Sequence, residues 1–313
     1  MPEIIKTRNL TKIYGETYAV DNINLSVKEG EIFGFIGLNG AGKTTTIRML
    51  LGMISPTSGS CYLKGQKVSP GNIDIWRDVG YIVETPYSYP ELTVRENLEI
   101  IRKLRNIKDK NCIDWIIRKL KLDEHATKKA KNLSLGNAQR LGIAKALMHK
   151  PKILILDEPI NGLDPAGIVE VRQMLLDLAR NSGVTIFISS HRLDEISKMT
   201  TRIAIIDEGK LIKEIDGKQL DTQLRKTLIL DGKDKNGMRT VLSKAGYKIY
   251  YRDTEDYSST FQIEDRDAVD NPDKIAKLLV NSGYPPTLLK VETEDLEDYF
   301  LRSIKEIGGI RYE

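Results

Sequence analysis

Short apolar runs alternate with segments of helical periodicity through residues 1–220. Residues 153–156 (ILIL) are apolar at every position, so both faces of this strand are expected to be buried, as in a parallel sheet. Elsewhere, apolar residues at helical spacing follow a T-x-x-E capping box made by Thr93 and Glu96. This alternation predicts an α/β fold with a mixed, mostly parallel sheet and a helical subdomain at about residues 85–150.

The pattern changes after about residue 226. Residues 226–292 are predicted to form strand, helix, strand, strand, helix and strand, the order of a ferredoxin-like α+β unit, and residues 295–305 an amphipathic helix. The charge changes near the same place. Residues 221–313 hold 15 Lys/Arg and 18 Asp/Glu, whereas residues 1–220 hold 33 and 26. We therefore predict a domain at residues 1–220 and a smaller accessory domain at 221–313.

Composition narrows the class of protein. A net charge of +4 in 313 residues does not demand a nucleic-acid partner. Two cysteines without metal-type spacing are typical of a reduced, cytosolic chain. No run approaches about 18 apolar residues, so any membrane role is expected to come through a partner. The basic stretch 102–131 is interpreted as a solvated outer face, with docking of an acidic partner or anionic lipid as the alternative.

A phosphate-binding loop follows the predicted strand at residues 31–37. The letters GLNGAGKT match G-x-x-x-x-G-K-[ST], in which glycines let backbone N–H groups turn toward phosphate oxygens. The helix that follows adds its positive N-terminal end. Lys43 is expected to reach the β- and γ-phosphates and Thr44 to ligate Mg²⁺. The nucleotide-binding residues predicted here are Gly37, Asn39, Gly40, Ala41, Gly42, Lys43, Thr44 and Thr45.

Two adjacent carboxylates end the apolar run 153–156. Burying them without partners would cost several kcal/mol, so a cation or a proton-transfer task is expected beside them. Asp157 is predicted to hold Mg²⁺ next to Thr44, because α/β sheets bind ligands at the carboxyl ends of their strands. Glu158 points the other way and is predicted to orient or deprotonate the attacking water. The alternative is a pair of solvated turn acids.

In order and spacing, these motifs resemble the ATP-binding subunit of an ABC transporter over about residues 1–220. The letters LSLGN resemble the family signature LSGGQ, which implies that Ser134 and Gly136 contact ATP held by the opposite subunit. Leu135 and Asn137 depart from that signature. The same resemblance implies three further roles for single residues. Asp164 would be the D-loop aspartate at the dimer interface, and His191 would be the switch histidine at the γ-phosphate. Tyr14 would stack on adenine.

One position differs from the commonest family pattern. After VGY-x-x the family usually has Gln, whereas this chain has Glu84. A carboxylate there would add negative charge near Mg²⁺, so Glu84 is predicted as a third metal residue; the alternative is a tolerated substitution in a loop. This Glu, the C-terminal extension and the ending LEDYFL resemble the bacitracin-resistance and lantibiotic-immunity branch of exporters.

The resemblance implies an ATPase that powers a membrane transporter, an exporter of an antimicrobial peptide or drug acting in antibiotic resistance. Its cofactors would be ATP and Mg²⁺, with Lys43, Glu158 and His191 catalytic. Its partners would be a membrane permease, contacted by residues 84–92, and a second copy in an ATP-sandwich homodimer. It would lie in the cytoplasm at the inner face of the membrane. The accessory domain is interpreted as regulatory or dimer-stabilising.

Two other functions remain open at this point. One is a soluble ABC ATPase acting on nucleic acid or in translation, although no coiled coil, zinc-type cysteine set or second cassette is visible. The other is a nucleotide-gated scaffold without catalysis, which the presence of Glu158 and His191 disfavours.

Overall fold

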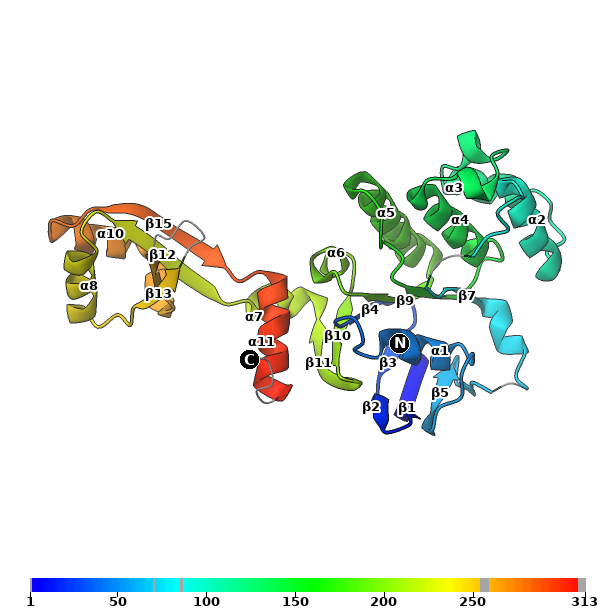
Figure 1. The fold of residues 1–313 in the computed structure, drawn as a ribbon, viewed down its shortest axis with the longest axis horizontal. Helices are drawn as coiled ribbons and strands as arrows, with labels where there is room; N and C mark the ends of the chain where they lie inside the picture. The colour runs from blue at the N-terminus through cyan, green and yellow to red at the C-terminus, as the bar shows by residue number, and fades with distance from the viewer. Residues whose placement is uncertain (1, 70, 85–86, 254–258, 309–313) are drawn as a thin grey trace. The chain divides into compact units, whose positions relative to one another are not determined.

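The computed structural model describes residues 2–69, 71–84, 87–253 and 259–308 (Figure 1). The chain divides into two compact units, which are considered separately below. The first comprises Met1–Lys218 together with Ser303–Glu313, and the second comprises Gln219–Arg302. None of the described helices is long and apolar enough to cross a membrane.

A six-stranded sheet forms the centre of the first unit. Its order is β11-β10-β4-β9-β8-β7, and all neighbours are parallel except β10 and β11. Every residue of β4, β8 and β9 is buried, which confirms the expectation of a strand covered on both faces at residues 153–156. The bounds are β4 Ile32–Ile36, β7 Val79–Ile82, β8 Ile153–Asp157, β9 Thr185–Ser190, β10 Arg202–Asp207 and β11 Lys210–Asp216.

Helix α1 (Lys43–Leu50) packs between the six-stranded sheet and a second, antiparallel sheet. Figure 1 shows α1 between the two sheets, with α5 (Pro165–Ser182) and α6 (Leu193–Ser197) on the other side of the six-stranded sheet. Ile47 of α1 shares one buried cluster with Ile153 and Ile155 of β8. The strands of the second sheet are β1 Glu3–Tyr14, β2 Thr17–Ile23, β3 Ser26–Lys28, β5 Ser58–Leu63 and β6 Gln66–Lys67.

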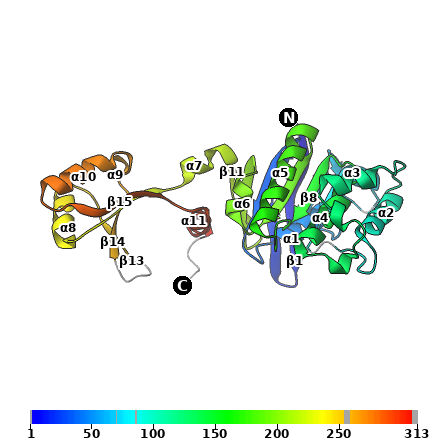
Figure 2. The ribbon, with the colours of Figure 1, turned by 90° about the horizontal axis from the view of Figure 1, so that it is seen from above.

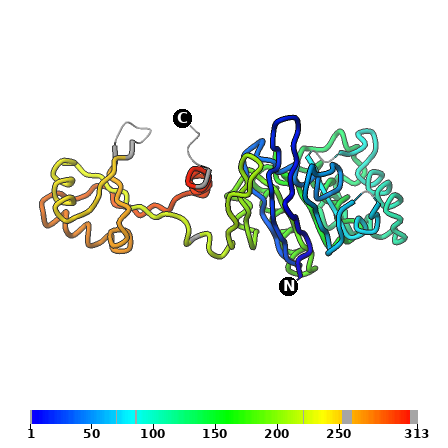
Figure 3. The backbone as a smooth tube through the Cα atoms, turned by 90° about the horizontal axis from the view of Figure 1, so that it is seen from below, coloured from blue at the N-terminus to red at the C-terminus, as the bar shows by residue number. Residues whose placement is uncertain are grey.

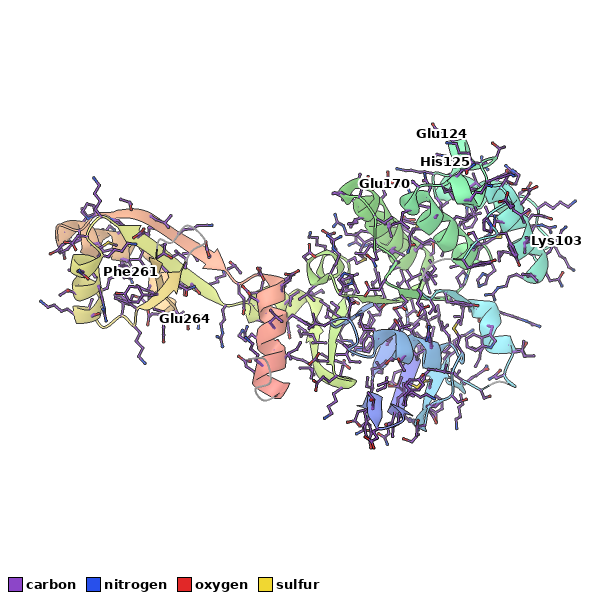
Figure 4. The ribbon with its side chains drawn as sticks, viewed as in Figure 1. Lys103, Glu124, His125, Glu170, Phe261 and Glu264 are labelled. Carbon is purple, nitrogen blue, oxygen red and sulfur yellow. The ribbon has the colours of Figure 1, made fainter. Side chains whose placement is uncertain are left out.

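The helical subdomain contains the predicted helices. The capping box at Thr93 and Glu96 is present, with both reciprocal hydrogen bonds made. Glu170 of α5 accepts a hydrogen bond from Arg140 of α4, so α5 is tied to this subdomain. Figure 2 shows α5 beside α4, and Figure 4 labels Glu170 on α5. The bounds are α2 Val94–Leu104, α3 Cys112–Lys119 and α4 Leu135–Leu147, with short 3₁₀ turns at η1 Asp74–Asp78, η2 Asp123–His125 and η3 Ala130–Asn132.

The second unit is built on a four-stranded antiparallel sheet of order β13-β14-β12-β15. Figure 3 shows the backbone of this unit in yellow to orange. Phe261 of β14 is buried between this sheet and its helices (Figure 4). The strands are β12 Lys226–Gly232, β13 Tyr250–Asp253, β14 Ser259–Ile263 and β15 Pro286–Thr293. The helices are α8 Lys235–Lys244, α9 Arg266–Asp270 and α10 Pro272–Asn281, with α7 Leu220–Gln223 before them. Two elements, η4 Gly217–Gln219 and α11 Leu296–Gly308, contain residues of both units.

Candidate active site

The loop at residues 37–42 joins β4 to α1 and needs glycine at two points. A Cβ on Gly37 would lie 2.4 Å from the Ile206 carbonyl oxygen, and one on Gly42 would lie 2.4 Å from the Ala19 carbonyl oxygen. Gly42 also has a φ of 102°, in the left-handed region that favours glycine. Gly42 is the N-cap of α1 and supplies no side-chain cap, so the first N–H groups of the helix remain available to an anion.

Lys43 lies across this loop and is almost fully buried. Its Nζ donates to the carbonyl oxygens of Gly37 (2.8 Å) and Leu38 (3.1 Å). The same Nζ is 3.4 Å from Glu158 Oε1, and the Lys43 side chain is 6% exposed. A buried ammonium facing backbone carbonyls and one carboxylate is well placed to receive phosphate oxygens.

Asp157 ends β8 and is 1% exposed. Its carboxylate accepts from the Thr44 hydroxyl at 2.8 Å and from the Ser189 hydroxyl at 2.6 Å. The structure therefore brings Thr44 and Asp157 together, as the sequence predicted. A hydroxyl and a carboxylate form a set of hard oxygen ligands of the kind that Mg²⁺ takes.

Sequence reasoning missed Ser189. It lies opposite Asp157 in the parallel β8/β9 register, and its hydroxyl also accepts from the Glu158 backbone N–H at 3.1 Å. The signal that it offered was a polar pair, Ser189 and Ser190, at the carboxyl end of an otherwise apolar strand.

Glu158 is placed apart from Asp157 by a left-handed backbone, with φ of 50°. Its Oε2 is 2.9 Å from His191 Nδ1, while its Oε1 faces Lys43. Lys43, Glu158 and His191 therefore form one cluster at the carboxyl edge of the sheet. An imidazole bonded to a carboxylate holds that carboxylate in one orientation, which a general base requires.

The signature residues lie at the start of α4, on the helical subdomain and on a different element from the phosphate loop. Ser134 is the N-cap of α4, and its hydroxyl accepts from the Asn137 N–H at 3.4 Å. The Asn137 amide nitrogen is 2.9 Å from Nε2 of His125, a residue for which the sequence suggested no role (Figure 4). Gly136 lies in the first turn of this helix.

Asp164 is the N-cap of α5, and its side chain accepts a hydrogen bond from the Gly167 N–H at 3.0 Å.

Tyr14 and Glu84 lie on the surface. Tyr14 ends β1, is 50% exposed, and has Lys12 Nζ 5.1 Å from its ring centre, so its ring is accessible for stacking. Glu84 is not placed with Thr44 and Asp157. Its Oε1 accepts from Arg48 Nη2 at 2.5 Å, and its side chain is 59% exposed. The metal role of Glu84 stays a prediction.

Together, the phosphate loop, the buried Asp157 and the Glu158–His191 pair define a P-loop ATPase site on a cassette fold. The chain belongs to the ABC transporter family, whose pattern matches residues 20–161. It is an ATP-binding subunit of that family, an ATPase coupled to transport.

Some curated relatives match nearly the whole chain and others only part of it. It is 44% identical over 309 residues to the bacitracin transport ATP-binding protein BcrA of Bacillus licheniformis, spanning 99% of both chains. It is 38% identical over 218 residues to the lantibiotic transport ATP-binding protein SrtF of Streptococcus pyogenes, spanning 69% of this chain and 93% of the relative. These relatives confirm the branch that the sequence resembled, and they favour transport over the nucleic-acid alternative.

Solved structures of ABC cassettes match about two thirds of the chain. A dimeric structure of the bacterial cassette MJ0796 aligns with a TM-score of 0.63 and 30% identity, over 68% of this chain and 98% of that one. A post-hydrolysis dimer of MJ0796 with ADP and phosphate aligns with a TM-score of 0.64 and 28% identity, over the same shares of the two chains.

Proposed function

We propose that this chain hydrolyses ATP to drive export of a peptide antibiotic of the bacitracin or lantibiotic kind, or of a related drug. The observation that carries this proposal is similarity to bacitracin transport proteins over the full length, second unit included, combined with an intact Lys43, Glu158 and His191 cluster. The test is to express the chain with its membrane partner in a sensitive bacterium. The wild-type chain is expected to make the bacterium resistant, and the Glu158→Gln variant is expected not to. If the wild-type chain leaves the sensitivity of the bacterium to such antibiotics unchanged, the choice of cargo is contradicted.

We propose the following role for each residue of the site. The loop N–H groups and Lys43 bind the phosphates of ATP, and Tyr14 stacks on adenine. Thr44 and Asp157 would hold Mg²⁺, which would supply positive charge to the phosphates of ATP. Glu158, oriented by His191, accepts a proton from the water that attacks the γ-phosphate. Steady-state hydrolysis by the purified protein, dependent on Mg²⁺, is the direct measurement.

A homodimer completes the site in this proposal. Ser134 and Gly136 are expected to contact ATP held by a second copy, with Asp164 at the interface. The support is the helix N-terminus at Ser134, together with the dimeric arrangement named for the solved relatives. Size-exclusion chromatography with and without Mg²⁺·ATP tests it.

A groove beside the helical subdomain suits a membrane permease. Its volume is about 570 Å³, and its lining includes Met53, Tyr81, Tyr87 and Leu104, all exposed. Lys145 stabilises one side of the groove by donating hydrogen bonds to the Tyr87 carbonyl and the Ser88 hydroxyl. An apolar groove with a polar rim is typical of a docking site. Docking there would place the chain at the cytoplasmic face of the membrane, and the identity of a co-purifying membrane subunit tests this.

The C-terminal region is proposed to be a ferredoxin-like domain within residues 221–313, following the ATP-binding domain at 1–220. The support is the β-α-β-β-α-β order with sheet order β13-β14-β12-β15 and a hydrophobic core of its own. A regulatory or dimer-stabilising role is proposed for it, because its hydrophobic core is separate from the cluster that includes Ala41 and Ile47 beside the phosphate loop. Comparison of dimer affinity with and without this domain tests that role.

A further inference from the structure

Strand β15 forms one long edge of the sheet in the second unit. The sheet order ends at β15, which spans Pro286–Thr293 and pairs with β12 on its inner side (Figure 1). Five of its eight residues are exposed: Thr287, Leu288, Lys290, Val291 and Thr293. Two of these are apolar, Leu288 at 40% exposure and Val291 at 36%. A long edge strand with exposed apolar side chains is a template for pairing with another strand.

The pairing with β12 shows which backbone groups of β15 point outward. The Glu294 N–H donates to the Arg225 carbonyl oxygen at 2.7 Å, in register with the pairs between β15 and β12. In an antiparallel ladder, the backbone groups of successive residues point to opposite sides, so the even-numbered residues of β15 bond to β12. The N–H and C=O groups of the odd-numbered residues from Thr287 to Thr293 therefore point away from the sheet.

The two faces of β15 carry different side chains. Leu289 packs against the hydrophobic core of this unit, and Val291 lies on the same face because it is two residues further on. Lys290 and Glu292 lie on the opposite face, where Lys290 Nζ is 3.3 Å from Glu292 Oε1. Their side chains are 63% and 35% exposed. A basic and an acidic residue on either side of an apolar one make this segment complementary to an antiparallel copy of itself.

Charge selects one register for two such copies. A two-fold axis through Val291, perpendicular to the sheet, places Lys290 opposite Glu292 of the partner subunit, and it forms this pair twice. It also brings the two Val291 side chains together on the other face and pairs the outward backbone groups of the odd-numbered residues. An axis through Lys290 or Glu292 would place like charges opposite each other, and an axis through Leu289 would pair neither charge.

We propose that β15 is a self-association edge, through which the second units of two copies of this chain join into one continuous antiparallel sheet without nucleotide. Val291 lies on the two-fold axis, and the pairs between Lys290 and Glu292 set the register. This contact raises the effective concentration of the two ATP-binding units for each other. The inference deepens the dimer-stabilising role in the proposed function and rests on it, but the contact itself needs no ATP.

Disulfide formation in the nucleotide-free, full-length protein tests the contact and its register. In a hydrogen-bonded antiparallel pair the two Cα atoms are about 5.5 Å apart, which a disulfide can bridge. Val291→Cys should therefore give a covalent dimer on mild oxidation. Thr287→Cys is the matched control, because Thr287 is exposed on the same edge but its two copies would be about 26 Å apart in this register. The native Cys61 and Cys112 are both buried.

Charge substitutions test what sets the register. Lys290→Gln removes both cross-strand pairs and should weaken the nucleotide-free dimer by roughly 2- to 30-fold in sedimentation velocity. Lys290→Glu should weaken it further, and the double substitution Lys290→Glu/Glu292→Lys should restore it. Arg266→Gln is the control, because it breaks another exposed ion pair of the same unit, with Asp270, and should leave the dimer unchanged.

Three results would overturn the proposal. They are the absence of a covalent Val291→Cys dimer, equal dimer formation by Val291→Cys and Thr287→Cys, and a dimer that Lys290→Glu leaves unchanged. If Val291→Cys forms the dimer but Glu158→Gln shows no ATP-dependent association, the contact at β15 is supported and the ATP-sandwich part of the proposed function is contradicted.

Discussion

Ser189→Ala tests how the buried Asp157 carboxylate is stabilised. The Ser189 hydroxyl is fully buried and donates to Asp157 Oδ1 at 2.6 Å, so the substitution removes one hydrogen bond to a charged acceptor. Such bonds contribute about 1.5–3 kcal/mol. Asp157 keeps the Thr44 hydroxyl. The Glu158 N–H loses the Ser189 hydroxyl at 3.1 Å but keeps the Ser189 carbonyl at 3.3 Å, so the bond to the carboxylate is the main loss.

The assay is calorimetry of the nucleotide-free protein. For a unit of this size 1 kcal/mol shifts Tm by about 2–4 °C, so a decrease of roughly 3–12 °C is expected for the transition of the first unit. Ser190→Ala is the matched control. Ser190 is equally buried on the same strand, but its hydroxyl accepts from a neutral backbone N–H of Arg192, and its loss should cost less. Equal effects of the two substitutions would refute the argument that the charge on Asp157 strengthens its bond.

Three further outcomes are expected. Lys43→Ala should abolish productive ATP binding in titration calorimetry, because it removes the buried ammonium at the phosphate loop; unchanged affinity would contradict the assignment of the loop. Glu158→Gln should bind ATP but not hydrolyse it, and should shift to a dimer in size-exclusion chromatography with Mg²⁺·ATP; wild-type turnover would exclude Glu158 as the base. Burial lowers the pKa of Lys145 from 10.5 to about 8, so the unfolded chain binds more protons between these values and stability should rise with pH across that window. Urea unfolding at pH 7.5 and 9.5 should show this rise in the wild type and a smaller one in Lys145→Met.

Local patterns in the sequence were sufficient for the elements that position the site. The apolar run 153–156 predicted a strand buried on both faces, because no exposed strand tolerates apolar residues on both sides. The capping box of Thr93 and Glu96 correctly predicted the start of α2, because both of its hydrogen bonds form between residues of a single helical turn.

The hairpin of β1 and β2 was not predicted, because the alternation in β1 is interrupted. The β1/β2 register shifts between Leu10 and Lys12 and again between Lys12 and Ile13. Each bulge moves the following side chains to the other face and breaks the period-two pattern from which a strand is recognised. In the structure, a tight turn with Gly15 at φ of 58° joins the two strands.

The residues missed at the site are those whose role depends on a partner distant in the sequence. Ser189 reaches Asp157 across 32 residues, and Arg48 reaches Glu84 across 36. These contacts depend on the register between neighbouring strands and on the direction in which a helix presents its side chains. A short sequence motif does not specify either. A motif predicts that a carboxylate belongs at the site, but the neighbouring donors decide whether it is held there. Asp157 is buried and bonded to two hydroxyls, so its carboxylate is held in place, whereas the exposed Glu84 carboxylate is bonded to Arg48.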